Sequence, residues 1–253
     1  MISELDLQRP NSKRTPVSRA FRRHVRIFVS THPLLYMLYA RLGGLRFQLN
    51  RHTDVLVDSY PRSANSFFEA AFSRAHGGGI SVAHHSHAAG QVLSGVKRGL
   101  PAVVLLRSPR DAIASFFEMN GGDYSIELCT REYVAFYTAL LPVLSEIIVV
   151  ETETLEERFF DLMQLLRREY NLKLDAYELT SSVRAELMRD VDETGRKRNG
   201  FKAERYSESL SNEEKKIRRD RLDRIIELIE APENETRFAQ AQEVYEKFRR
   251  HAV

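Results

Sequence analysis

The sequence contains one cysteine, Cys129, and no tryptophan. One cysteine cannot form an internal disulfide, and no CxxC or Cys/His cluster has zinc-site spacing, so we expect a cytoplasmic protein without a bound metal. The net charge is also small, because 38 basic and 35 acidic residues leave only +3. The slight basic excess favours anionic partners, without the charge density expected of a dedicated nucleic-acid binder.

No apolar run reaches the length of about 20 residues that a transmembrane helix needs, so we expect no transmembrane segment. Residues 1–50 instead contain a basic amphipathic segment with helical spacing. Its arginines and apolar residues are Arg19, Arg22, Arg23, Arg26, Phe21, Val25, Phe28, Leu34, Leu35 and Leu38. We expect the apolar side chains to pack into the core, in preference to docking on an anionic membrane; peripheral membrane contact is the alternative.

The 253 residues, 43% of them hydrophobic, fit a single domain spanning 1–253. Apolar runs predict strands at 55–59, 80–83, 102–107 and 147–151, and helical spacing predicts helices at 66–75, 89–98, 110–118, 124–144 and 155–170. Strands that are apolar throughout and alternate with helices indicate an α/β fold, with a central parallel β-sheet flanked by helices on both faces.

The C-terminal part is predicted to be helical. Ser211 and Glu214 have the spacing of a capping box, which places a helix start just before the amphipathic stretch 217–229, and a last helix is expected over 236–250. Between these helices and the predicted sheet, residues 192–209 are polar and charged. We interpret them as a possible lid loop.

The most informative stretch is DVLVDSYPRSANSF, residues 54–67, in which an apolar strand runs directly into a polar turn and a helix. Such a junction aims backbone N–H groups, the positive end of a helix dipole and the Arg62 side chain at one point, which suits a phosphate or sulfate group. The alternative is an ordinary connection with Asn65 or Ser66 as helix cap. The stretch lacks the GxxxxGK[ST] pattern of nucleotide hydrolases.

A second junction, in AVVLLRSPRDAIAS, has Arg107 at the end of a strand and Ser115 on the following helix. The two side chains could meet one phosphate; the alternative is a surface arginine and an unrelated small residue. Ligands of open parallel sheets bind beyond the carboxyl ends of the strands. We therefore expect both junctions to face the same crevice.

Together, SYPRSANSF and VVLLRSPRDAIASF resemble the phosphosulfate loop and the 3′-phosphate motif of the sulfotransferases that use 3′-phosphoadenosine 5′-phosphosulfate. The resemblance covers about residues 53–118 and implies the P-loop-like sulfotransferase fold. It implies that the donor is held by Arg62, Ser63, Ala64, Asn65, Ser66 and Phe67 at the phosphosulfate end, and by Arg107 and Ser115 at the 3′-phosphate. Departures from the family pattern are Ala64 for glycine, Ser66 for threonine and Phe67 for tryptophan.

Three histidines, His84, His85 and His87, follow the second predicted strand, where this family commonly has its catalytic base. A neutral imidazole suits proton removal near pH 7. The expected order is His85, then His87, then His84, with Arg62 also catalytic; zinc ligands or plain polar residues are the alternatives. The late basic run with Arg196 and Lys197 resembles the segment with which this family closes over the 3′-phosphate of the nucleotide. The alternative is a solvated run of charged residues.

The resemblance thus implies sulfuryl transfer to an acceptor hydroxyl or amine, with no metal. The acceptor class stays open among carbohydrate, lipid and small molecule. A nucleotide-dependent kinase, which would require magnesium and acidic ligands, is the enzymatic alternative. A catalytically inactive anion-binding or membrane-peripheral protein is the alternative from another class.

Overall fold

The computed structural model describes residues 16–43, 48–121, 123–199 and 210–253, without the side chains of 16–19 and 195–199. Its centre is one all-parallel sheet of β1 (Val55–Ser59), β2 (Val82–His84), β3 (Ala102–Leu106) and β4 (Ile148–Glu151) in the order β2-β1-β3-β4. The predicted α/β fold with a parallel sheet is confirmed.

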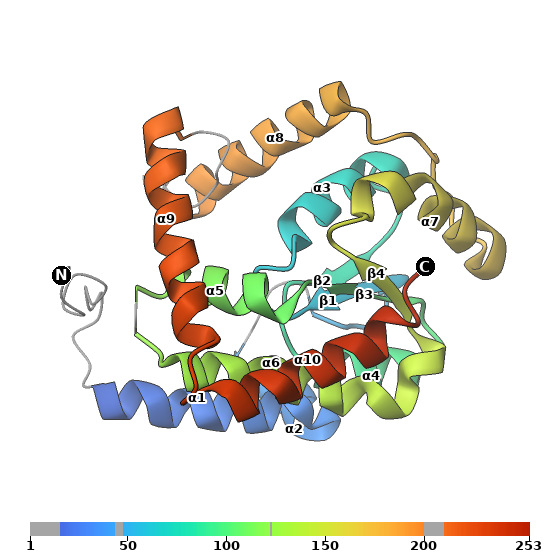
Figure 1. Ribbon diagram of the computed structural model, residues 1–253. Helices are drawn as coiled ribbons and strands as arrows, with labels where there is room; N and C mark the ends of the chain where they lie inside the picture. Colours follow the sequence, from blue (N-terminus) through green and yellow to red (C-terminus); the bar gives the residue numbers. More distant parts are fainter. Residues whose placement is uncertain (1–15, 44–47, 122, 200–209) are drawn as a thin grey trace.

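Helices cover both faces of this sheet (Figure 1). One face packs against α3 (Asn65–His76), α7 (Leu155–Tyr170) and α8 (Ser181–Asn199). The other packs against α4 (Ala89–Val96), α5 (Pro109–Met119), α6 (Ile126–Leu140), α9 (Asn212–Ile229) and α10 (Glu235–Arg249). Side chains alternate along each strand, so Val103 joins the first core and Val104 the second. A strand buried on both faces therefore reads as a continuous apolar run.

The strand order puts a topological switch point between β1 and β3. From β1 the chain continues to β2 on one side, and the next strand, β3, pairs with β1 on the other. Helix α3, which leaves β1, and helix α5, which leaves β3, lie on opposite faces of the sheet. Their divergence opens a crevice at the carboxyl ends of these two strands, where open α/β sheets bind ligands.

The N-terminal helices α1 (Pro16–Thr31) and α2 (Pro33–Gly43) form an outer layer along one edge of the molecule, against α6 and α4 (Figure 1). Among the described side chains of each helix, the buried ones lie on one side: Arg23 and Ile27 on α1, Tyr36 and Ala40 on α2. The expectation that the apolar residues of this segment pack into the core is wrong for the six it named. Phe21, Val25, Phe28, Leu34, Leu35 and Leu38 are all exposed.

Two further expectations need correction. The possible lid loop is helical in its first part, because α8 continues to Asn199; residues 200–209 lie outside the described part. The helix expected over 124–144 is shorter, since α6 ends at Leu140 and a 3₁₀ helix, Leu141–Glu146, follows. Pro142 explains this end, because proline has no N–H for the helical hydrogen bond. No described helix has both the length and the apolar content needed to cross a bilayer.

Candidate functional site

A cavity of about 1070 Å³ lies at the switch point. Both polar junctions line it, as do the loop after β2 and residues of α5, α8 and α9. The predicted donor-binding and catalytic residues that line it are Arg62, Ala64, Asn65, Ser66, Phe67, His85, His87, Arg107 and Ser115. The expected shared crevice is therefore present. Ser63 and His84 are buried behind it. The side chains of Arg196 and Lys197 lie outside the described part.

The β1–α3 junction leaves the N-terminus of its helix without a side-chain cap. Ala64 occupies the N-cap position with φ 56° and makes no side-chain hydrogen bond. The alternative of an ordinary connection capped by Asn65 or Ser66 is therefore wrong. The Asn65 Oδ1 atom accepts from Ser59 Oγ at 2.7 Å, while Asn65 Nδ2 is buried without a partner in the described part of the chain. Uncapped amides and an unused amide donor suit an anion.

The two junctions contact each other directly. Arg62 Nε donates to Ser115 Oγ at 3.1 Å, and Arg107 Nη1 donates to the carbonyl oxygen of Arg62 at 2.8 Å. Burial lowers the pKa of Arg107. A guanidinium is the strongest base among the side chains, so it keeps its charge in such a site. The cavity thus brings together two cationic side chains that lie 45 positions apart.

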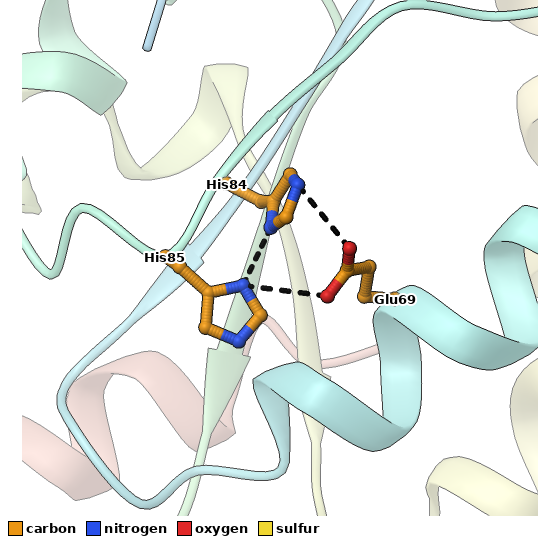
Figure 2. Close-up of side chains that lie close together, drawn as sticks. All are labelled: Glu69, His84 and His85. Carbon is orange, nitrogen blue, oxygen red and sulfur yellow. Dashed lines mark hydrogen bonds and ion pairs between the residues drawn. The ribbon is translucent and has the colours of Figure 1, made fainter. Parts of the chain in front are cut away.

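The histidines His84 and His85 form a chain of polar contacts with Glu69 of α3 (Figure 2). Their Nδ1 atoms are 2.5 Å apart, and His84 Nε2 lies 3.4 Å from Glu69 Oε1. At the cavity end, His85 Nε2 lies 3.1 Å from Ser66 Oγ. With Glu69 ionised and both rings neutral, His84 presents Nε2–H to the carboxylate. His85 then donates Nδ1–H to His84, so His85 Nε2 keeps a lone pair toward Ser66 and the cavity.

Glu69 was missed by sequence reasoning. Its only signal was its place four residues after Asn65, one helical turn along α3 from the predicted cradle. Glu69, His84 and His85 place one ligand atom each within 4.8 Å of one another, and two imidazoles with a carboxylate form a donor set that zinc accepts. A metal ion on His85 Nδ1 would have to displace the hydrogen bond between the rings. The contacts present are those of a hydrogen-bonded relay.

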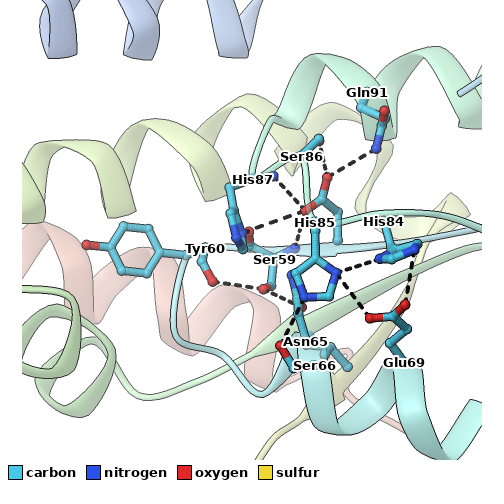
Figure 3. Close-up of polar contacts among 12 residues, drawn as sticks. Ser59, Tyr60, Asn65, Ser66, Glu69, His84, His85, Ser86, His87 and Gln91 are labelled. Carbon is cyan, nitrogen blue, oxygen red and sulfur yellow. Dashed lines mark hydrogen bonds and ion pairs between the residues drawn. The ribbon is translucent and has the colours of Figure 1, made fainter. Parts of the chain in front are cut away.

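His87 is held by a separate network around Asp58. Figure 3 labels its other members Ser59, Ser86 and His87. Asp58 Oδ1 accepts from the backbone N–H groups of Ser59 and His87, each at 2.9 Å, and its other oxygen accepts from Ser86 Oγ. His87 Nδ1 lies 2.9 Å from the carbonyl oxygen of Ser59. Because a carbonyl only accepts, Nδ1 carries the proton.

Burial sets the pKa values of this second network. It raises the pKa of Asp58 to about 6 and lowers that of His87 to about 3. His87 is therefore neutral near pH 7 and a weak base. The network fixes the loop after β2, which also carries His85.

Backbone strain is concentrated in the cavity wall. Among the described residues, five that are not glycine have a positive φ: Arg62, Ala64, His85, His87 and Asn171. All of these except Asn171 line the cavity. Left-handed backbone at such residues is unfavourable by about 1–3 kcal/mol each and is characteristic of functional sites. Residue type does not mark this conformation at Arg62, His85 or His87, because glycine is its usual marker. Ala64, by contrast, stands where the resemblance expects a glycine.

Basic residues of α8 and α9 were also missed. Arg184 of α8 and Lys215, Arg218 and Arg219 of α9 line the same cavity. Arg218 Nε pairs with Glu118 at 3.0 Å, whereas Lys215 and Arg219 pair with no acidic side chain in the described part of the chain. The signal was the basic run in 215–221, which amphipathic spacing alone assigns to a helix surface. Its cations add positive charge opposite the two junctions.

Comparisons of the chain with protein-family models, curated proteins and solved structures found no match.

Proposed function

We propose that this protein is a sulfotransferase that moves a sulfuryl group from 3′-phosphoadenosine 5′-phosphosulfate to an acceptor hydroxyl or amine. The observation that carries the proposal is the contact between the two junctions, Arg62 Nε to Ser115 Oγ, at the wall of one cavity. The resemblance assigns these two residues to opposite ends of one nucleotide. Had they faced separate regions, a shared ligand would be impossible.

The residues present fit a donor with two anionic ends. The phosphosulfate end has the Arg62 guanidinium, the first amides of α3, which no side chain caps, and Asn65 Nδ2, which has no hydrogen-bond partner in the described part of the chain. These are the kinds of donor that suit an anion. At the 3′-phosphate end, Arg107 and Ser115 are available. Lys215 and Arg219 face the same space from α9. Bound there, the donor would supply the sulfuryl group and leave as adenosine 3′,5′-bisphosphate.

We assign His85 as the base. Its Nε2 atom keeps a lone pair toward the cavity. Its Nδ1 atom contacts His84 and lies near the Glu69 carboxylate, which balances the positive charge that forms on the ring when it accepts a proton. His87 lines the same cavity, but burial lowers its pKa to about 3, which makes it a poor proton acceptor. Arg62 and the amides of α3 would stabilise negative charge on the departing nucleotide. No metal is required for these roles.

Thermal-shift measurements with adenosine 3′,5′-bisphosphate, ATP and GTP test the binding site, because a ligand that binds only the native state raises its stability. We expect stabilisation by the bisphosphate without magnesium. Arg62→Ala removes one charge-assisted contact, worth about 1.5–3 kcal/mol, and should weaken binding by roughly 10- to 150-fold. Arg158→Ala, an exposed arginine of α7 away from the cavity, is the matched control. Stabilisation by ATP with magnesium alone would instead favour the kinase.

Transfer from radiolabelled donor to a panel of sugar, lipid and small phenol or amine acceptors tests the reaction. We expect His85→Asn to remove most turnover while leaving the bisphosphate thermal shift in place, since the base acts on the acceptor. Arg62→Ala, still folded, should lose both. Bisphosphate binding with no transfer to any acceptor class would identify the inactive anion-binding alternative. Parent-like transfer by folded Arg62→Ala would refute the proposal.

A further inference from the structure

The outer faces of α1 and α2 form the largest gathering of exposed apolar side chains in the described part of the chain. Eight of its twelve exposed large apolar side chains belong to these two helices. They are Phe21, Val25, Phe28, Leu34, Leu35, Leu38, Tyr39 and Leu42. Leu34 is 86% exposed and Leu42 78%, which is unusual for leucine unless the surface is covered by something else.

Helical geometry places six of these residues opposite the buried sides of the two helices. On α1, Phe21, Val25 and Phe28 follow the spacing of one stripe, about half a turn from Arg23 and Ile27. On α2, Leu34, Leu38 and Leu42 form a stripe in the same way, opposite Tyr36 and Ala40. Both helices lie along one edge of the molecule (Figure 1), so both stripes point away from its body.

A buried ion pair fixes this orientation. Arg23 Nε and Nη2 donate to the two carboxylate oxygens of Glu132 on α6, each at 2.6 Å. The Arg23 guanidinium also lies over the ring of Phe116, 4.8 Å from its centre. Turning the stripe of α1 inward would expose this contact and leave Glu132 buried without its partner, which is strongly unfavourable. The apolar stripe of α1 is therefore held outward.

The charge around the stripes selects the partner. Residues 16–43 contain no aspartate or glutamate. Arg22, Arg26 and Arg41 are exposed, and none of them pairs with an acidic side chain in the described part of the chain. Apolar stripes bordered by unpaired arginines match the boundary between anionic headgroups and acyl chains. A second copy of this chain would bring two positive faces together, which is repulsive.

We propose that the outer face of α1 and α2 docks on an anionic lipid bilayer. The helices lie flat, with the leucine and phenylalanine stripes inserted at the headgroup boundary and the arginines at the phosphates. No side chain of α1 or α2 that the structure describes lines the cavity. Docking is therefore separable from ligand binding.

Cosedimentation of the full chain with vesicles tests the proposal. We expect binding to mixed phosphatidylcholine and phosphatidylglycerol vesicles that weakens with added salt, and much weaker binding to phosphatidylcholine alone. Leu34→Ser with Leu38→Ser should weaken binding by about tenfold or more, from lost apolar burial. Arg22→Glu with Arg41→Glu should weaken it by about fivefold or more for each arginine.

Matched controls distinguish binding by this face from nonspecific apolar or electrostatic adsorption to vesicles. Ile217→Ser with Leu228→Ser changes exposed apolar residues of α9, and Arg158→Glu with Arg167→Glu changes exposed arginines of α7. We expect both controls to bind vesicles like the parent, and all variants to keep the bisphosphate thermal shift. Absence of parent binding to anionic vesicles, or equal loss in the controls, overturns the proposal. So does a dimer in sedimentation velocity that the leucine pair dissociates, which would assign the face to a second copy.

Discussion

The β1–α3 and β3–α5 junctions lie side by side at the sheet edge, yet they satisfy their helix ends differently. At β3–α5, Ser108 Oγ accepts from the backbone N–H of Asp111 at 3.2 Å, and Pro109 opens the helix. At β1–α3, the N-cap residue Ala64 has a left-handed backbone and makes no capping bond. One helix is capped by a side chain of its own junction, whereas the first amides of the other helix have no side-chain cap.

The strands that lead into the two junctions differ as well. Asp58, near the end of β1, is fully buried, and its register partner on β3 is the apolar Val104. Asp58 accepts a hydrogen bond from the backbone of His87 and so holds its loop. The raised pKa of Asp58 and the lowered pKa of His87 therefore both belong to the β1 side. We therefore expect the β1 side to carry a pH dependence that comes from Asp58 and His87.

The largest expected effect comes from His87→Gln. The folded pKa of His87 is lowered to about 3, so its contribution to stability is lost as the pH falls from 6.5 toward 3. The folded pKa of Asp58 is raised from 3.8 to about 6, so its contribution is present below pH 3.8 and lost as the pH rises through 6. In the parent, between pH 4 and 6, His87 makes the free energy of unfolding rise with pH and Asp58 makes it fall. The two contributions therefore oppose each other.

Without His87, nothing opposes the fall in the free energy of unfolding that Asp58 causes as the pH rises. Relative to the parent, the free energy of unfolding of His87→Gln should fall with rising pH between 4 and 6, by up to about 1.4 kcal/mol per pH unit. Urea unfolding at several pH values measures this difference. His251→Gln, an exposed histidine far from the site, should keep the parent's slope. Parallel pH profiles for the parent and His87→Gln would contradict the opposing contributions of His87 and Asp58.

A smaller effect distinguishes the caps themselves. Ser108→Ala should lower the free energy of unfolding by about 1 kcal/mol, because it removes the capping bond to Asp111. Ser66→Ala should change it by less than about 0.5 kcal/mol, because Ser66 caps nothing and the His85 nitrogen it contacts can bind water from the cavity. Urea unfolding at neutral pH compares them. Equal losses would mean that Ser66 supports α3 after all.

The sequence was sufficient for the sheet and for the meeting of the two junctions. Apolar runs mark buried parallel strands, and the loops at the carboxyl ends of parallel strands share one edge of the sheet. The sequence alone therefore predicts that Arg62 and Arg107 lie near each other. The capping box of Ser211 and Glu214 was also readable, and both of its hydrogen bonds are present. The capping box is a local pattern, and the shared edge follows from the parallel sheet itself.

What could not be predicted depends on tertiary packing. Apolar spacing in α1 shows an amphipathic helix but not which side meets the body; the buried Arg23 and Glu132 pair decides that. Glu69 joins the histidines only because α3 lies beside the end of β2. The polar run that looked like a lid is helical up to Asn199. Left-handed backbone at Arg62 and His85 leaves no mark in residue type.

The smallest expected effect tests the strain of the β1–α3 junction, through Ala64→Gly. Alanine in left-handed backbone is unfavourable by about 1–2 kcal/mol, while glycine loses about 0.4–1 kcal/mol more entropy on folding, so a net gain of about 0.5 kcal/mol in unfolding free energy is expected. Ala70→Gly, in the middle of α3, should instead lower it by about 0.5–1 kcal/mol. Thermal and urea unfolding compare the two. Because only a left-handed position reverses the usual sign of an alanine-to-glycine change, a loss at Ala64 would mean that the β1–α3 junction stores no strain.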